Sequence, residues 1–388
     1  MSQFDCAIVG AGMVGATTAL ALAELGLTIV LIDKYPVKPF NKEQNFDLRV
    51  SAISLSSQAL LAQVGAWQQL TQWRLCPYKR LGVWENESAY TEFDSTNINQ
   101  SHLGHIIENR LLQLSLWQQI EAHSNITLLC PEELISYQRV EDDLYLTLST
   151  QVITSKLLIA ADGANSHVRK LANIGTTGWD YQQAAMLVHV ETEREQQDIT
   201  WQQFFETGPV AMLPLPGNNA SLVWYHQKEE IKRLSDLSNE ILTDEIHQKF
   251  PKKLGRVKVI NKASFNLTRR HANDYVKERV VLLGDAAHTI NPLAGQGVNL
   301  GFKDVKALQI TLATAIGDGE SWYDIATLKA YEKARRADNL LMMTTMDLLT
   351  KTFSHPSPVL KGLRNFGLTV ANKTPFLKKK ALAYACGV

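Results

Sequence analysis

Three glycines near the start of the chain have the spacing of a phosphate-binding turn. Gly10, Gly12 and Gly15 form Gly-x-Gly-x-x-Gly, where the missing side chains allow a tight turn, close approach of a pyrophosphate and close helix packing. Asp33 follows about 20 residues later, where a carboxylate can accept hydrogen bonds from adenosine ribose hydroxyls and disfavours a 2′-phosphate. A glycine-rich turn can also serve packing alone. Together these residues predict a bound dinucleotide, without separating FAD from NAD.

A second glycine-rich segment, residues 280–299, reads VVLLGDAAHTINPLAGQGVN and opens as a short apolar strand. Ligands bind at the carboxyl end of such strands in open α/β sheets. An aspartate there can accept a hydrogen bond from a flavin ribityl hydroxyl, and a helix N-terminus can stabilise the negative charge of reduced flavin. The alternative is a strand, turn and helix with a capping aspartate. The cofactor-binding residues predicted here are Gly284, Asp285, Pro292, Gly295, Gly297 and Asn299.

The third motif, residues 161–169, reads ADGANSHVR and again follows an apolar strand. Asp162 and Gly163 form the turn, Ser166 can cap the next helix, and Arg169 lies within that helix. Alone, an Asp-Gly turn means little. Because it stands between the first glycine turn and Asp285, it favours FAD as the dinucleotide.

The elements that must position these motifs alternate between strand and helix. Residues 6–9 and 28–32 are apolar and β-like, and residues 16–25 between them have helical composition, which predicts a βαβ unit. Two later apolar runs, 157–161 and 280–283, are expected to join the same parallel sheet. A parallel sheet needs both faces covered, so we expect a doubly wound α/β core.

Residues 76–93 and 186–224 are richer in alternating and aromatic residues, as is typical of an antiparallel sheet with one covered face. We therefore predict an α/β protein with a Rossmann-like FAD-binding domain, an inserted mixed or antiparallel β-sheet substrate domain and a helical C-terminus. The predicted boundaries are 1–72, 105–178 and 273–345 for the discontinuous FAD-binding domain, 73–104 and 179–272 for the substrate domain, and 346–388 for the helical region.

Composition excludes several classes of function. Lys plus Arg and Asp plus Glu both number 39, so no bulk charge attracts nucleic acid. The four cysteines have neither zinc-like spacing nor a close redox pair, and we expect free thiols, no metal site and a reducing compartment. The start lacks a secretory pattern, and no stretch approaches the roughly 20 apolar residues that span a bilayer. We therefore expect a cytoplasmic protein.

With these motifs in place, the chain resembles the flavoprotein aromatic hydroxylases related to para-hydroxybenzoate hydroxylase. More narrowly, it resembles the ubiquinone-biosynthesis hydroxylases along nearly its whole length, through DLRVSAIS at 47–54, ENRLLQLSLW at 108–117 and the ADG and GDAAH motifs. WQQFFETGPVAMLPL, ASLVWY and LTRRHA resemble the branch acting on 2-polyprenyl-3-methyl-6-methoxy-1,4-benzoquinol. A sibling hydroxylase acting at another ring carbon, or a flavin-binding scaffold without turnover, remains an alternative.

The resemblance also implies roles for individual residues. It places Arg49 near the FAD phosphates or ribityl chain, Arg110 near the cofactor, Asp162 near the pyrophosphate and Asp285 at the ribityl chain. Surface ion pairs are the alternative for both arginines. Asp33 stands where many members of the family have glutamate, and the shorter acid should still reach the ribose.

The implied reaction needs an external donor, NADH or NADPH, which binds without a second nucleotide-binding domain. Reduced FAD then captures molecular oxygen as a flavin hydroperoxide, and the quinol ring attacks its distal oxygen. No side chain is assigned a catalytic role. His288 is the obvious candidate base, but we favour a structural role because a neutral imidazole can satisfy backbone groups.

Two further features have open interpretations. Six side chains of the inserted sheet either line a quinol pocket or form core, namely Met186, Phe204, Phe205, Met212, Trp224 and Tyr225. No acidic residue follows Asp347, whereas seven basic residues do. This tail is either an ordinary solvated helix or a surface that holds the enzyme against anionic lipid or another ubiquinone-biosynthesis protein.

Overall fold

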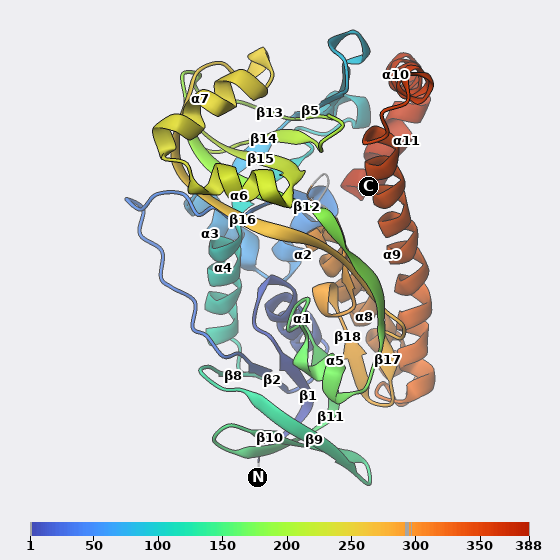
Figure 1. Cartoon of the computed structure of the whole chain (residues 1–388). Helices are drawn as coiled ribbons and strands as arrows, with labels where there is room; N and C mark the ends of the chain where they lie inside the picture. The colour runs from blue at the N-terminus through green and yellow to red at the C-terminus, as the bar shows by residue number, and fades with distance from the viewer. Residues whose placement is uncertain (1, 292–294, 296, 388) are drawn as a thin grey trace.

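The computed structural model describes residues 2–291, 295 and 297–387. Figure 1 shows two sheet layers, one above the other, with a long C-terminal helix along one side. Short helices and 3-10 turns stand between the strands along the chain, namely α2 (Leu55–Gln63), α3 (Ala66–Gln72), α5 (His167–Leu171), α6 (Lys228–Asp236), η1 (Glu87–Ala89), η2 (Ser95–Ile98), η3 (Lys252–Leu254) and η4 (Gly284–Ala286).

The three motifs follow the carboxyl ends of parallel strands β1, β11 and β18 in the lower sheet. Its path is β17-β18-β11-β1-β2-β8, and all strands from β18 to β8 run parallel. The predicted sharing of one parallel sheet by the four apolar runs is confirmed. The hairpin β9–β10 joins β11 at its lower end. The strands are β1 (Gln3–Val9), β2 (Ile29–Ile32), β8 (Ile126–Leu129), β9 (Leu134–Val140), β10 (Asp143–Leu148), β11 (Val152–Ala160), β17 (Val276–Lys277) and β18 (Val280–Leu282).

Helix α1 (Met13–Ala23) is buried almost all round. It packs between the sheet and two further helices, α4 (Asn109–Glu121) and α8 (Gly297–Gly317). A helix covered on every side has no need for a polar face, which explains its run of Ala, Leu and Thr. The glycine turn before α1 is therefore held by a fully packed βα unit.

The upper sheet has the order β19-β16-β12-β15-β14-β13-β5-β6. Its pairs are antiparallel except β13 with β5, which run parallel. The long strands β12 and β16 reach down to the lower layer (Figure 1). The strands are β5 (Arg80–Trp84), β6 (Thr91–Asp94), β12 (Thr176–Thr192), β13 (Ile199–Gln203), β14 (Val210–Pro214), β15 (Asn219–Gln227), β16 (Val257–Ala272) and β19 (His288–Thr289).

A small sheet and the C-terminal helices complete the fold. The small sheet has the order β3-β7-β4, and α6 and α7 cover one face of the upper sheet around a core that includes Trp201. The remaining elements are β3 (Val50–Ser54), β4 (Cys76–Tyr78), β7 (Gly104–Glu108), α7 (Asn239–Lys249), α9 (Ile325–Phe353), α10 (Pro358–Lys373) and α11 (Pro375–Cys386).

This architecture confirms the predicted fold class, an α/β fold with mixed sheets and a helical C-terminus. The predicted domain boundaries stay a prediction. All four cysteines are free thiols. Among the described residues, no helix is long and apolar enough to cross a membrane.

Candidate functional site

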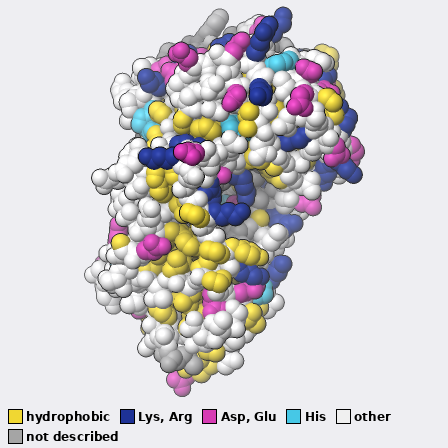
Figure 2. Space-filling model, turned by 90° about the vertical axis from the view of Figure 1, so that its left-hand side faces the viewer, with side chains coloured by type: hydrophobic (Ala, Val, Ile, Leu, Met, Phe, Trp, Pro, Cys, Tyr) yellow, Lys and Arg dark blue, Asp and Glu magenta, His cyan; other side chains and the backbone are white. Residues whose placement is uncertain are grey.

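A cavity of about 860 Å³ lies between the two main sheets. Its walls come from the glycine turn, β3, the upper sheet, the start of α8, and helices α9 and α11. Figure 2, which looks at the side that carries α3, α4 and α7, shows the molecule hollowed near its middle, with basic and apolar side chains around the hollow. The cavity therefore joins the predicted cofactor motifs to the inserted sheet.

The three glycines of the first motif meet different constraints. A Cβ on Gly10, whose φ is +99°, would lie 2.4 Å from the Ala161 carbonyl oxygen, and a Cβ on Gly15 would lie 1.8 Å from the Gly10 carbonyl oxygen. A Cβ on Gly12 would meet nothing within 4 Å, and Gly12 lines the cavity. Gly10 and Gly15 are thus needed for packing, whereas Gly12 leaves space for a ligand.

Asp33 lies directly after β2 and ties down the glycine turn. Its carboxylate accepts hydrogen bonds from the backbone N–H of Ala11 at 2.6 Å and of Tyr35 at 3.0 Å. The side chain is partly exposed and lies outside the cavity wall. Its predicted contact with a ribose stays a prediction.

Asp162 has one satisfied and one unsatisfied oxygen. Oδ2 accepts from the backbone N–H of His167 at 2.7 Å and of Val168 at 3.1 Å, which caps α5. Oδ1 is buried and has no hydrogen-bond partner among the described residues. The next residue, Gly163, has a φ of +80° and lines the cavity, and a Cβ on it would meet nothing within 4 Å. Because an unpaired buried acceptor is costly, a hydrogen-bond donor on a ligand fits this position.

Asp285 of η4 and Arg49, the residue before β3, both line the cavity. The Asp285 side chain lies deep in the molecule yet is solvent-accessible through the cavity. Burial raises the pKa of its carboxyl above the ordinary value, while His288 and Arg49 oppose that rise. The Arg49 side chain is exposed and has no hydrogen bond or ion pair to any described side chain. Arg49 is therefore free to meet an anionic ligand.

Glycines on both sides of Asp285 in the sequence form more of this wall. Gly284, with a φ of +55°, packs against Val14, and Gly295, with a φ of +63°, packs against Ala52. Gly297 opens α8, and a Cβ there would meet nothing within 4 Å. Pro292 lies outside the described residues.

Asn299 lines the cavity, but its amide is occupied by the protein. Its Oδ1 accepts from the Ser54 backbone N–H at 3.0 Å and the Ser57 hydroxyl at 2.8 Å, and its Nδ2 donates to the Ala52 carbonyl at 2.8 Å. Asn299 thus clamps α8 to β3 and α2. The geometry assigns it a positioning role.

Arg110 does not reach the cavity. Its guanidinium forms a two-armed ion pair with Asp47, at 2.9 and 3.1 Å, and donates to the carbonyls of Lys38 and Pro39. These contacts hold the segment that leads to Arg49. The observed contacts of Arg110 are those of the ion pair that the sequence left open as an alternative. Direct contact of Arg110 with the cofactor stays a prediction.

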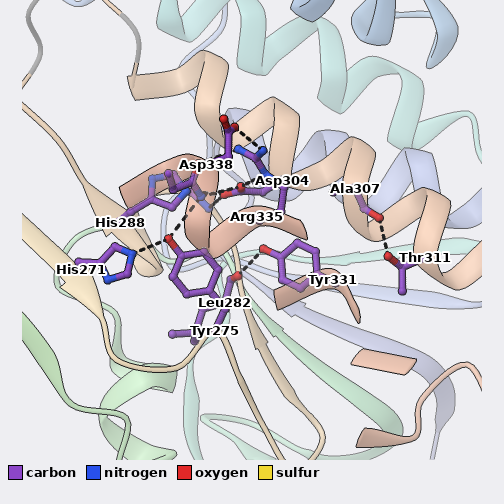
Figure 3. A network of polar contacts seen from close by, with 12 residues as sticks. His271, Tyr275, Leu282, His288, Asp304, Ala307, Thr311, Tyr331, Arg335 and Asp338 are labelled. Atoms are coloured by element: carbon purple, nitrogen blue, oxygen red, sulfur yellow. Dashed lines mark hydrogen bonds and ion pairs between the residues drawn. The ribbon is translucent and has the colours of Figure 1, made fainter. Parts of the chain in front are cut away.

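His288 belongs to a buried polar network behind the cavity wall (Figure 3). Its Nε2 lies 2.5 Å from Oδ2 of Asp304, which also accepts from the Gly284 backbone N–H at 3.0 Å. Oδ1 of Asp304 accepts from Arg335 at 2.8 Å and Asn339 at 3.0 Å. Burial alone would raise the pKa of Asp304, but His288 and Arg335 outweigh it and the pKa lies below the ordinary value. The network therefore fixes the turn that presents Asp285.

Sequence reasoning missed Asp304 and Arg335. Asp304 occupies the buried face of α8, in register with Leu300 and Leu308 at spacings of four residues. A charged residue on an apolar helical stripe is the signal that could have identified it, because a buried charge requires a partner. The sequence could not show that this partner comes from α9.

The same network predicts a loss of stability in acid. His271, which contacts the Tyr275 hydroxyl at 3.1 Å, has its pKa lowered to about 4 by burial and by neighbouring cationic groups, first Arg336. The unfolded chain gains this proton near pH 6.5 and the folded protein only near 4. The free energy of unfolding should therefore fall as pH drops from about 6.5 to 4. Urea unfolding across this window should show a shallower fall in His271→Gln, and an unchanged slope would contradict the assignment.

The six apolar candidates divide between cavity and core. Phe204 and Tyr225 line the cavity. The others belong to the core between the upper sheet and helices α6 and α7, or pack against that core, namely Met186, Phe205, Met212 and Trp224. Contact of any of them with substrate stays a prediction.

These features test whether the chain fits FAD. A dinucleotide needs close backbone approach, and Cβ atoms on Gly12, Gly163 and Gly297 would enter open space. Its hydroxyl groups need acceptors: Asp285 lines the cavity, and Asp162, next to the cavity-lining Gly163, has a buried oxygen without a partner among the described residues. Its phosphates need positive charge, available from Arg49 and the N-terminus of α1. The residues present fit the cofactor.

Comparisons with known proteins agree with this geometry. Residues 3–344 match the family described as FAD binding domain. The chain is 45% identical over 385 residues to 3-demethoxyubiquinol 3-hydroxylase of Escherichia coli, covering 99% of this chain and 98% of that one. It is 32% identical to the human ubiquinone biosynthesis monooxygenase COQ6, covering 98% and 92%. The solved structure of p-nitrophenol 4-monooxygenase from Pseudomonas putida superposes with a TM-score of 0.80 at 17% identity, covering 99% and 98%, and shows the same fold.

Proposed function

The chain belongs to the FAD-dependent hydroxylases of ubiquinone biosynthesis, and from that premise we propose that its substrate is 2-polyprenyl-3-methyl-6-methoxy-1,4-benzoquinol. The enzyme is an FAD-dependent monooxygenase that hydroxylates a quinol ring with molecular oxygen. The proposal concerns which ring and which carbon.

The identity to the E. coli enzyme carries this proposal. A ubiquinol ring bears a polyprenyl chain, a methyl group and two methoxy groups. The proposed substrate has one methoxy group fewer, so it is a demethoxyubiquinol, the compound class in the name of that relative. The reaction would place the hydroxyl at the ring carbon that later carries the missing methoxy group.

We assign the cofactor contacts to three groups of residues. The turn at Gly12 and the N-terminus of α1 would hold the pyrophosphate. Asp162 and Asp285 would accept hydrogen bonds from hydroxyls of the bound cofactor, and Arg49 would neutralise phosphate charge. When bound, FAD supplies the activation of molecular oxygen.

The chain's own residues would orient the ring and exclude water. The part of the cavity beneath the upper sheet is lined by apolar side chains, among them Phe204, Leu213, Val223 and Leu267. Such a wall binds an aromatic ring by burial and leaves its hydroxyl groups to the few polar positions, including Thr200 and Gln202. Removing bulk water strengthens every charge interaction at the reacting carbon.

The electron donor and the partners belong to the same proposal. We propose NADH or NADPH as the donor. Because the substrate carries an insoluble isoprenoid chain, the enzyme should receive it either at a membrane surface or from another ubiquinone-biosynthesis protein.

The test is turnover of a short-chain demethoxyubiquinol by the FAD-loaded protein. We expect substrate-stimulated oxidation of NADH or NADPH, with a product heavier by one oxygen atom that derives from labelled molecular oxygen. Turnover of an earlier polyprenyl phenol of the pathway, without turnover of the demethoxyubiquinol, would favour the sibling hydroxylase. FAD binding without stimulated oxidation of either donor, on any quinol of the pathway, would favour the scaffold instead.

A further inference from the structure

Helix α10 turns an apolar side toward solvent. Four of its side chains are between 39% and 72% exposed, namely Val359, Leu363, Phe366 and Val370. Their spacings of four, three and four residues place them within about 60° of one another on a helix of 3.6 residues per turn. They form one continuous row, which we call the α10 stripe.

The opposite side of α10 is attached to the protein by polar groups. Arg364 is buried and pairs with buried Glu85, at 2.6 Å between Nη2 and Oε1 and 3.2 Å between Nε and Oε2. Asn365 donates to the same carboxylate at 3.0 Å. This buried two-armed pair fixes the rotation of α10 about its own axis, because turning the helix would leave both charges buried without a partner. The α10 stripe is therefore held outward, the reverse of an ordinary surface helix.

The chain segment that carries the α10 stripe has charged residues of one sign. The 41 residues after Asp347 contain seven Lys or Arg and no Asp or Glu. On α11, Lys379 and Lys380 are exposed, and Lys380 Nζ lies 4.6 Å from the ring centre of Phe376, which is 63% exposed. Apolar and aromatic side chains beside cations match the boundary between the phosphates and acyl chains of an anionic bilayer.

The same helical region forms a wall of the cavity. Leu382, Ala385 and Cys386 of α11 line it, as do Met346 and other residues of α9. In Figure 1, α10 and α11 lie together at the upper end of α9. A surface bound at the α10 stripe would therefore lie next to elements that enclose the cavity.

We propose that the α10 stripe and the lysines of α11 dock this protein on the surface of an anionic lipid bilayer. The stripe enters the acyl boundary, and the lysines pair with lipid phosphates. Docking itself does not depend on the identity of the substrate. Only its benefit, a short path from the bilayer to the cavity for a lipid-tailed ring, rests on the proposed function.

The test is sedimentation of the full-length, FAD-loaded protein with vesicles of phosphatidylcholine, with or without phosphatidylglycerol. We expect binding to the anionic vesicles that weakens with added salt. Leu363→Ser/Phe366→Ser should weaken it about tenfold or more, and Lys379→Glu/Lys380→Glu should do the same. All four side chains are exposed, so the melting temperature and FAD content should match those of the parent.

Matched substitutions elsewhere supply the controls. Ile241→Ser removes an apolar side chain on α7 that is 52% exposed, and Lys252→Glu/Lys258→Glu reverses two exposed lysines near the upper sheet. Both should bind vesicles as the parent does. Vesicle binding is measured without turnover, so its failure is separate from failure of the proposed reaction.

Two results would overturn the proposal. One is equal binding of the parent and Leu363→Ser/Phe366→Ser to anionic vesicles. The other is a parent protein that does not bind vesicles but forms a dimer, with the dimer lost in Leu363→Ser/Phe366→Ser. That result would assign the α10 stripe to contact with a second copy of the chain.

Discussion

Replacing Gly12 with valine is expected to abolish most FAD binding while leaving the apoprotein as stable as the parent. Gly12 has φ −68° and ψ −174°, which valine adopts without strain, and a Cβ there meets nothing within 4 Å. The free energy of unfolding should change by no more than about 0.5 kcal/mol. Because the side chain would fill the space proposed for the pyrophosphate, the FAD dissociation constant should rise about a hundredfold or more. Flavin fluorescence titration measures the affinity, and urea unfolding measures the stability.

Gly15→Ala is the matched control, since it tests the same turn with a smaller side chain. Its Cβ would lie 1.8 Å from the Gly10 carbonyl oxygen and 3.0 Å from the Ala161 Cβ. Relieving this contact must move backbone, so Gly15→Ala should destabilise the apoprotein by about 1–3 kcal/mol or more. If Gly12→Val lost as much stability as Gly15→Ala, the space at Gly12 would not be reserved for a ligand.

Replacing Asp304 with asparagine should destabilise the folded protein by about 3–5 kcal/mol. Asp304 is fully buried and is the shared partner of His288, Arg335 and the Gly284 backbone N–H. Asparagine keeps the size but removes the charge that compensates the buried guanidinium, and its amide group turns a donor toward other donors. Thermal and urea unfolding of the apoprotein measure the loss. FAD should also bind less tightly at temperatures where the variant is folded, because the turn carrying Asp285 loses its anchor.

Asp338→Asn supplies the comparison, because Asp338 pairs with the same arginine at 2.7 Å but is 29% exposed. Water can replace that partner, so this variant should lose no more than about 1 kcal/mol. If Asp304→Asn and Asp338→Asn lost the same free energy of unfolding, the burial of Asp304 would not be the cause of its large effect. The lowered pKa of Asp304 adds a second check. Its contribution is present above the ordinary carboxyl pKa of about 4 and is lost as pH falls below that value.

The cofactor motifs could be read from the sequence because their constraints are local. The spacing of Gly10, Gly12 and Gly15, the apolar runs before Asp162 and Asp285, and the helical composition of α1 all depend on neighbours within a few residues. Parallel pairing followed from the same pattern, since a βαβ unit allows few other arrangements. The fold class and the cofactor could therefore be predicted without coordinates.

The sequence by itself thus determined the dinucleotide turn, the parallel sheet that carries it and the family resemblance. Only the tertiary structure decided which side chains reach the cavity, which left Arg49 free and tied Arg110 to Asp47. It also decided that Asp304 would meet Arg335, and that Glu85 and Arg364 would hold the apolar side of α10 outward. The physical reason is that burial and ion pairing depend on residues that are distant in the sequence, which a local pattern does not bring together.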